Sequence, residues 1–526
     1  PTIGLLPPAD DAYANWRNAG LAKIGGMPNR TMICATVNPG GVDDAPAIKS
    51  AIQNCQVGQV VMLVGSLGVR LIDLPIRVTK GITVRGSGTC DASISIYPAP
   101  LCQASVTVTD GITAYTSGQC GSGTCPNGGP AVFEVSPVAP SYNYSWAKCG
   151  NIGSGTAAST GTNCGALPLA ADAAQGQTTI RLVSTSGLAV GAWVLIDEAS
   201  GAGWVADPLN AVTGFGNVWA ASDWLSSSSS PATGRVLWSK GQNANWDFSA
   251  NSYPYQPGSV GCWRSYCDRP TAELHQVAAI GPGPCPGAQC TVTFDDPLTI
   301  AFRQSGGHNA QVYPALYANQ SGSGSPIAFV QQASIENLSI LRGPNGGIAM
   351  EFCAYCRISG VQVGEWYGGG ITLTYTARTE LSAVYIDHCW NSVNSGGEYP
   401  IALDTASTEI LITDSITAFA GKGMVARAGG AGSVVSYSVF DDTMYDGRSG
   451  IGNYWVDLAG NPSHYSGPHH VLFEGNWSDN LDADNTHGNA VYMTFFRNQG
   501  TGLRTPFVDP SIGRQVNDAA GIGYTN

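Results

Sequence analysis

The sequence predicts an all-β protein that is mostly a β-solenoid, a stack of similar coils, with a short capping helix and an inserted β module. The first observation is a hydrophobic residue that recurs in the last third of the chain, two positions before Asn, Gly, Ala, Asp or Tyr. These residues are Ile335, Ile358, Leu381, Ile412, Val435, Phe473 and Phe496. Their separations of 23, 23, 31, 23, 38 and 23 residues return to one value after two interruptions. Such spacing is typical of a solenoid with loops inserted into particular coils.

The composition is the second observation. Charged residues make up 12% of the 526-residue chain and 68 residues are Gly, which is typical of turn-rich β structure. Because the formal net charge is −13 and no basic stripe exists to follow phosphates, we do not expect a nucleic acid partner. The same deficit of positive charge disfavours a strongly anionic substrate unless a bound cation bridges it.

The 15 cysteines are the third observation, and they indicate a secreted, extracellular protein. Their spacing suggests six local pairs: Cys34–Cys55, Cys90–Cys102, Cys120–Cys125, Cys149–Cys164, Cys262–Cys267 and Cys285–Cys290. Of the other three, we expect Cys353 or Cys356 to pair with Cys389 and the third to be a buried thiol. The alternative of a metal or redox pair at Cys353 and Cys356 lacks a second thiol pair or a nearby His. The chain starts at Pro1 and contains no apolar run of 18 residues, so we expect no membrane span.

The N-terminal part predicts a cap over the open end of the solenoid. Residues 43–55 form the clearest helix, because Asp43 or Asp44 can cap it and Pro46 suits its first turn. Its apolar stripe consists of Ile48, Ala51, Ile52 and Cys55. Strand-like segments follow at 60–64, 69–72 and 82–86. A short amphipathic helix in this place would cover core and strand edges that the first coil leaves exposed.

The segment GGVDDAPAIKSAIQNCQVGQVVMLVGS resembles the N-terminal segment of the pectate-lyase-like right-handed parallel β-helix superfamily. With the C-terminal coils, the resemblance covers residues 30 to 90 and 325 to 505. It implies a right-handed parallel β-helix of a kind found in lyases, polygalacturonase-like hydrolases, other glycanases, epimerases and phage tailspikes. The polygalacturonase-like catalytic pattern is absent except for Asp441 and Asp442, and the Arg-containing strand of calcium-dependent pectate lyases is not found.

Three parts are expected along the chain. Residues 1–165 hold the cap helix, the first coils and loops rich in Gly, Ser and Cys that disulfides fix in place. Residues 166–302 alternate as strands and turns around a Trp-rich segment and form the inserted module. Residues 303–526 form the main coils and a C-terminal tail.

If the recurring residues stack, positions further along each coil should also form columns. The fifth position beyond each Asn, Gly, Ala, Asp or Tyr reads Arg342, Glu365, His388, Phe419, Asp442 and Asn480. The fourth reads Leu341, Gly364, Asp387, Ala418, Asp441 and Asp479. Acid and base groups on neighbouring coils would face one groove, so we name as candidate catalytic residues Glu365, Asp387, His388, Asp441 and Asp442. The alternative is that these side chains only bond turn amides.

The spacing of the candidates offers a test. Asp387 and Asp441 would be two coils apart, about 9.6 Å at the strand spacing, near the upper limit of about 9.5 Å for an inverting glycosidase. Glu365 and His388 would be one coil apart. Enlarged loops and aromatic residues near the columns suggest substrate-binding roles, or caps over loop cores, for Arg342, Trp366, Tyr367, Trp390, Glu398, Tyr445 and Arg448.

No sequence motif indicates a cofactor, so none is expected. The segment SDNLDADNTHGN could hold Ca²⁺ through Asp482 and Asp484, but it lacks a closing Glu, so turn chemistry is favoured.

These features predict a secreted polysaccharide-degrading enzyme, foremost a glycoside hydrolase that uses paired carboxylates. One alternative is a polysaccharide lyase with His388 as base and Arg342 or Arg448 as neutraliser of the uronate. Another is a glycan-binding or structural protein without catalysis.

Overall fold

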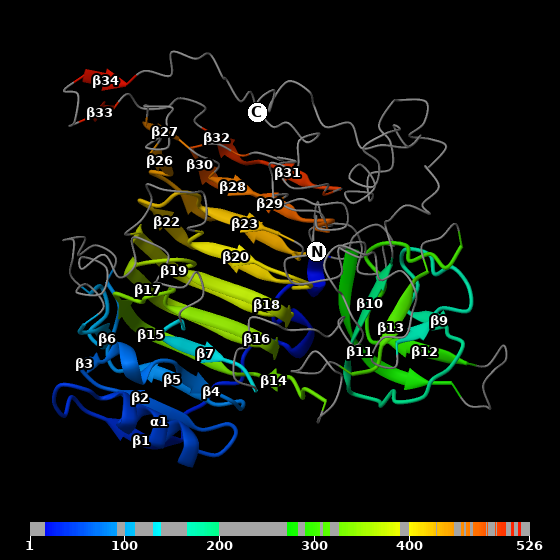
Figure 1. The fold of residues 1–526 in the computed structure, drawn as a ribbon, viewed down its shortest axis with the longest axis horizontal. Helices are drawn as coiled ribbons and strands as arrows, with labels where there is room; N and C mark the ends of the chain where they lie inside the picture. Colours follow the sequence, from blue (N-terminus) through cyan, green and yellow to red (C-terminus); the bar gives the residue numbers. More distant parts are fainter. Residues whose placement is uncertain are drawn as a thin grey trace.

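A computed structural model describes the greater part of the coils and a smaller part of the inserted module. The described residues are 16–91, 100–110, 130–137, 166–198, 271–281, 290–305, 309–315, 326–389, 399–427, 429–446, 454–456, 459–462, 467–479, 481, 490, 492–500, 507–509 and 514–516. Figure 1 shows a ladder of stacked parallel strands with a separate sheet at one side, and the first coils lie at the lower end. The predicted all-β parallel β-helix is therefore confirmed by the strand pairing.

The largest sheet has 16 strands and bends along its length, so that it forms two arms of the coil. The first arm is paired in parallel through β1 (Ile33–Val37), β2 (Val60–Leu63), β5 (Thr83–Gly86), β15 (Ser334–Leu341), β17 (Arg357–Trp366), β19 (Glu380–Cys389), β21 (Leu411–Thr413), β24 (Val434–Ser436), β29 (Leu472–Glu474) and β31 (Thr494–Phe496). The second arm consists of β3 (Ser66–Val69), β6 (Ser105–Val108), the later halves of β15, β17 and β19, β22 (Ile416–Ala418), β25 (Val439–Phe440), β30 (Trp477–Ser478) and β32 (Gln499–Gly500).

A second parallel sheet forms the third arm. Its strands are β4 (Ile76–Val78), β7 (Phe133–Val135), β14 (Val330–Gln331), β16 (Ile348–Ala354), β18 (Ile371–Ala377), β20 (Ile401–Leu403), β23 (Met424–Ala426) and β28 (Gly460–Asn461). Two antiparallel hairpins lie outside the coils, β26 (Met444–Asp446) with β27 (Tyr454–Val456) and β33 (Phe507–Asp509) with β34 (Arg514–Val516). Among the described helices, none is long and apolar enough to cross a membrane.

The register predicted from the recurring residues is confirmed for six of the seven. Pairing runs without a slip through Ile335, Ile358, Leu381, Ile412, Val435 and Phe473. The seventh is wrong by one residue, because Phe473 pairs with Phe495 and not with Phe496. The rings of Phe473 and Phe495 pack with centroids 5.4 Å apart, and Arg497, at φ 54°, takes the corner conformation expected of Asn498.

Asn498 instead belongs, half-buried, to a ladder of polar side chains inside the later coils whose other members are buried. Ser415 Oγ accepts from the Val384 amide, Ser438 Oγ from the Ser415 amide, and Asn476 Oδ1 from the Ser438 amide. Asn476 Nδ2 in turn donates to Asn498 Oδ1 and to the Val435 carbonyl, both at 2.9 Å. Each side chain therefore satisfies backbone groups at the bend between the first and second arms.

We expect Asn476→Ala to lower the free energy of unfolding by about 1–3 kcal/mol, since it leaves the buried Ser438 amide and Val435 carbonyl short of a partner. Urea titration measures this loss. Asn54→Ala, which removes one exposed 3.4 Å hydrogen bond to Ser50, is the matched control and should change stability by less than about 0.5 kcal/mol. Equal effects of the two variants would contradict a structural role of the ladder.

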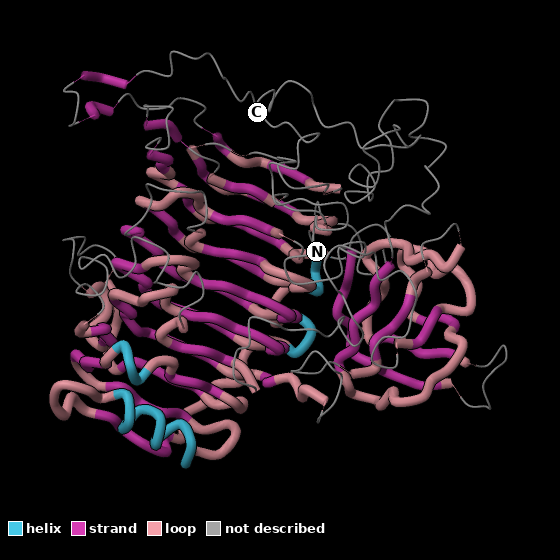
Figure 2. The backbone as a smooth tube through the Cα atoms, in the orientation of Figure 1, coloured by secondary structure: helices cyan, strands magenta, loops and turns pink. Residues whose placement is uncertain are grey.

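The cap forms as predicted. Helix α1 (Ala45–Asn54) buries Ala45, Ile48, Ala51 and Ile52 against the first coils, and Figure 2 shows it at the lower end of the stack. Asp43 Oδ1 accepts from the Ala45 amide, while Asp44 binds the amides of Gly40 and Gly68. The strand expected at 69–72 is wrong, because β3 ends at Val69 and Leu71–Asp73 is a 3-10 turn, η3.

The antiparallel module packs beside the third arm (Figure 1). Its strands are β8 (Leu167–Pro168), β9 (Thr179–Arg181), β10 (Trp193–Glu198), β11 (Thr271–Ile280), β12 (Thr291–Phe294) and β13 (Gln311–Tyr313), in the order β8-β13-β10-β11-β12-β9. Trp193 and Leu274 of the module share one apolar cluster with Phe352, Tyr355 and Tyr375 of the coils. Two short helices, η1 (Trp16–Asn18) and η2 (Ala22–Ile24), lie beside this junction.

The disulfides differ from expectation at one place. Cys34–Cys55 and Cys90–Cys102 are confirmed. Cys353 and Cys356 pair with each other, and Cys389 carries a buried thiol, so the expected bridge to Cys389 is wrong. Cys353 and Cys356 flank one turn before the first arm, whereas Cys389 ends the second arm. Cys290 is also disulfide-bonded, and the expected pairs that lie outside the described residues are Cys120–Cys125, Cys149–Cys164 and Cys262–Cys267.

Candidate functional site

Both predicted columns exist, at the end of the second arm, except that Asn480 lies outside the described residues. Pairing places Leu341, Gly364, Asp387 and Ala418 side by side. Asp441 and Asp479 continue this column, because the preceding residue Phe440 pairs with Thr417 on one side and Ser478 on the other. The next position is a corner with a left-handed backbone at Arg342, Glu365, His388, Phe419 and Asp442, with φ between 47° and 64°. The two coils expected between Asp387 and Asp441, and the one coil between Glu365 and His388, are therefore confirmed.

Asp387 and His388 form a dyad at the corner of β19. His388 Nδ1 lies 2.8 Å from Asp387 Oδ2, and the imidazole stacks on Phe419 with centroids 4.4 Å apart. Asp387 is buried, and its Oδ1 has no hydrogen-bond partner among the described residues. A Cβ at Gly364 would lie 3.1 Å from that oxygen, so the missing side chain makes room for the carboxylate. Asp387 is thus placed to orient His388, whose side chain is 27% exposed.

Three carboxyl groups gather two and three coils further on. Asp479 Oδ2 accepts from the Thr443 amide at 3.1 Å and from its hydroxyl at 3.3 Å. The pKa of Asp479 is raised to about 6, first by burial and also by Asp441 and Asp442, while the hydrogen bond from the Thr443 amide opposes the rise. The pKa of Asp442 is also raised, first by burial and then by Asp441, while His388 lowers it. Like charges this close cannot all ionise, so Asp479 retains a proton in mildly acidic solution.

Arg342 and Glu365 neutralise each other at the earlier corners. Arg342 Nε lies 2.8 Å from Glu365 Oε2, and the carboxylate is nearly buried. Tyr367 is half-buried beyond them. Trp366 is fully buried in the main core, so the expectation that its ring contacts substrate is wrong. It follows the left-handed residue Glu365, which turns the chain so that the indole points inward.

Several predicted site residues are not placed by the structure. Tyr445 belongs to β26, and no contact of its side chain is described. The others lie outside the described residues: Trp390, Glu398, Arg448 and the candidate metal ligands Asp482 and Asp484. Within the described part of the chain, no group of three or more His, Cys, Asp or Glu residues is arranged to hold a metal ion.

Residues 100–102, next to the Cys90–Cys102 disulfide, cover the second arm on its early coils. The Leu101 amide donates to Gln362 Oε1 at 2.7 Å, and the Cys102 amide donates to Ser339 Oγ at 2.9 Å. Among the described residues, no segment covers the later coils in this way: Ile416 is 37% exposed, and its neighbours Val439 and Trp477 are half-buried. The open part of the second arm therefore starts beside the dyad and leads to the carboxyl cluster.

Sequence reasoning did not select three residues of this site. Asp479 stands in the column of Asp387, and Phe419 stands beside His388 in the column of corner residues. Neither was selected as a candidate site residue. Tyr385 lies two positions before Asp387 on the outer side of the second arm; burial raises its pKa, as do Asp387 and Asp442. The period of two along a strand was a signal that could have identified Tyr385.

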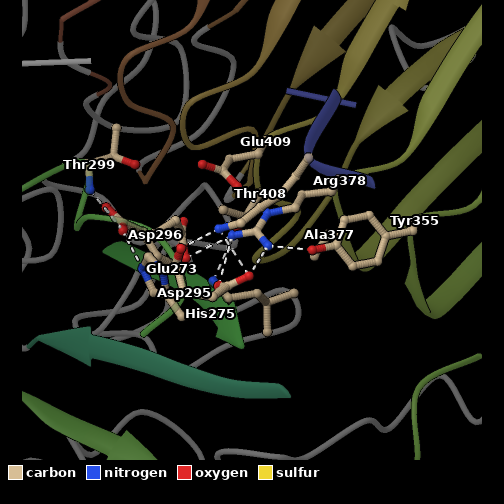
Figure 3. A network of polar contacts seen from close by, with 12 residues as sticks. Glu273, His275, Asp295, Asp296, Thr299, Tyr355, Ala377, Arg378, Thr408 and Glu409 are labelled. Carbon is tan, nitrogen blue, oxygen red and sulfur yellow. Dashed lines mark hydrogen bonds and ion pairs between the residues drawn. The ribbon is translucent and has the colours of Figure 1, made fainter. Parts of the chain in front are cut away.

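A second polar cluster joins the module to the coils (Figure 3). Arg378, a fully buried corner residue, binds Glu409 Oε2 and Asp295 Oδ2 at 2.6 Å and Asp296 Oδ1 at 2.7 Å. His275 lies between Glu273 and Asp296, at 2.7 and 3.0 Å. Burial alone would lower the pKa of His275, but Asp296 and Glu273 raise it to about 10. Since Arg378, His275 and Glu273 are inaccessible to solvent, we assign this cluster to stability.

No protein-family model and no curated protein matches the chain. Among solved structures, it is similar to the tailspike gp61 of Pseudomonas phage phi297, at 9% identity over 86% of this chain and 66% of that one, with a TM-score of 0.29. It is also similar to the Gp54 tailspike of Acinetobacter baumannii bacteriophage AP22, solved with a capsular saccharide, at 8% identity over 87% and 66%, TM-score 0.28. A family 28 exopolygalacturonase of Yersinia enterocolitica matches at 10% over 91% and 69%, TM-score 0.24. The chain spans slightly less than two thirds of each of these two tailspikes.

Proposed function

We propose that this protein is a polysaccharide-degrading enzyme that acts outside the cell, and specifically a glycoside hydrolase on a neutral or weakly acidic glycan. The observation that carries the proposal is the carboxyl cluster of Asp441, Asp442 and Asp479 at the open end of the second arm. In this cluster Asp479, whose pKa is raised, serves as the acid, and the exposed carboxylate of Asp442 serves as the base.

The proposed reaction uses only side chains and water. The proton held by Asp479 beside Asp441 passes to the glycosidic oxygen as the bond from that oxygen to the anomeric carbon breaks. Water forms the new bond to the anomeric carbon and gives its proton to Asp442. His388, held by Asp387 and packed on Phe419, bounds the opposite side of the cluster.

Electrostatics favour this reaction over elimination. A lyase needs positive charge at the uronate carboxylate, but Arg342 is already paired with Glu365. The described surroundings of His388 also include the carboxyl groups of Asp387 and Asp442. An anionic sugar would meet net negative charge there unless a cation accompanied it.

The test is a screen of the purified protein against neutral and acidic polysaccharides, with reducing ends and ultraviolet absorbance read together. New reducing ends without absorbance support hydrolysis, provided that the Asp441→Asn/Asp479→Asn variant produces none. Absorbance from an unsaturated product would replace the proposal with elimination. Retardation in polysaccharide gels without any product would replace it with glycan binding alone.

A further inference from the structure

An exposed tyrosine marks the other edge of the open second arm. Tyr437 is 58% exposed and stands at the left-handed corner between β24 and β25, with φ 49°. Along the same coil, Val439 and then Asp441 follow it. At about 3.3 Å per residue, Tyr437 is ~13 Å from Asp441 along the strand.

The Tyr437 ring is exposed, but it is held in place. A Cβ on Gly475, the corner residue of the next coil, would lie 2.8 Å from ring atom Cε1 and 2.9 Å from Cδ1. The ring therefore rests directly on the glycine backbone, which any other residue would prevent. Gly475 also has φ 67°, a conformation that favours glycine.

Arg497 is the corner residue one coil beyond Gly475, and its guanidinium is near the Tyr437 hydroxyl. Its guanidinium donates to Glu474 Oε1, and its pKa is raised first by that hydrogen bond and also by the hydroxyl of Tyr437. The Arg497 guanidinium in turn lies 4.9 Å from the Phe496 ring centroid. A rigid aromatic side chain loses little conformational entropy on binding, so it is a favourable contact surface.

The surface between Tyr437 and the carboxyl cluster is open and partly apolar. It contains Ile416, Val439 and Trp477, one from each of three neighbouring coils. Leu101, next to the Cys90–Cys102 disulfide, covers the corresponding surface of earlier coils, where Gln362 is buried. An extended ligand at the cluster can therefore follow the strand direction toward Tyr437.

We propose that Tyr437 is a sugar-binding platform that forms a remote subsite for the same glycan. This inference rests on the proposed function and specifies its substrate as an oligosaccharide or longer chain that spans ~13 Å along the second arm. The apolar face of a pyranose ring packs on the phenol ring, while sugar hydroxyls reach Arg497. Because only a sufficiently long glycan reaches both Tyr437 and the carboxyl cluster, affinity should increase with the length of the glycan.

The experiment measures retardation in gels that contain a neutral β-glucan, a xylan, a galactomannan or a polyuronate. All variants carry Asp479→Asn, so that binding is read without cleavage. Tyr437→Ala should weaken binding to the retarding polysaccharide by about threefold to tenfold. Tyr437→Phe, which keeps the ring, should retain most of the affinity. Tyr492→Ala is the matched control, because Tyr492 is 60% exposed but stands at a different corner, against His470.

Unchanged binding by Tyr437→Ala, an equal loss in Tyr492→Ala, or no retardation in any gel would overturn the inference. The two proposals fail separately. Binding that depends on Tyr437 in a protein that never produces reducing ends would support the platform and reject hydrolysis. With cleavable substrates, Tyr437→Ala should raise KM for long chains and leave KM unchanged for oligosaccharides too short to reach the ring.

Discussion

Asp479→Asn should reduce kcat by about 100-fold to 10,000-fold on any polysaccharide that the protein hydrolyses, since it removes the protonated acid of the cluster. The fold should survive, because an asparagine oxygen can still accept from the Thr443 amide and hydroxyl. Asp414→Asn is the matched control: Asp414 is exposed at a left-handed corner, away from the cluster, and accepts from Thr413. It should keep wild-type activity. Full activity in Asp479→Asn would reject this residue as the acid.

The pH dependence tests the same assignment. Asp479 must be protonated to act, and burial together with Asp441 and Asp442 raises its pKa to about 6, so wild-type activity should fall as pH rises through 6. The raised pKa means that the folded state binds this proton more tightly than the unfolded state does. Stability should therefore decline as pH rises from 3.8, the ordinary value, past 6. Asp479→Asn should flatten this part of the stability profile, which urea titration at several pH values would measure.

Arg378→Met should lower the free energy of unfolding by about 3–5 kcal/mol, because it leaves buried carboxylates without their cation. Arg378 contacts Asp295 and Asp296 of the module and Glu409 of the coils, so the loss should also loosen the module from the third arm. Trp193, whose ring lies 5.3 Å from the guanidinium carbon, reports this through its fluorescence. Arg70→Met, which removes an exposed contact 3.9 Å from Asp110, is the control and should cost less than about 1 kcal/mol.

A double variant tests the cause of that loss. Burial raises the pKa of Glu409 to about 7, as does Asp296, while Arg378 lowers it. If unpaired charge is responsible, Asp296→Asn combined with Arg378→Met should recover part of the stability. A double variant no more stable than Arg378→Met alone would instead point to the lost contacts of the guanidinium with the rings of Trp193 and Tyr355.

The sequence by itself determined the coils, their register up to Phe473 and the two columns that hold the candidate site residues. Stacking forces each coil to repeat the same inward and outward positions, so the period of 23 between Ile358 and Leu381 is enough to place Asp387 beside Gly364. The register was lost only at the last coil, where Phe495 replaces Phe496 because ring packing and the Asn476 ladder set the final step. Trp366 was misassigned because one corner residue reverses which side of the strand faces the core.

Only the tertiary structure decided which members of the columns are chemically distinct. The raised pKa of Asp479 depends on burial and on two carboxyl groups from a neighbouring coil, and the orientation of His388 depends on Asp387 and on Phe419 across an inserted loop. The loop at Cys102 covers Ser339, which is 237 residues away in the chain. Periodicity records what each coil repeats, whereas these contacts join side chains that are unrelated in spacing. The energies of these contacts depend on burial and on the distances between side chains, and the sequence of a single coil specifies neither.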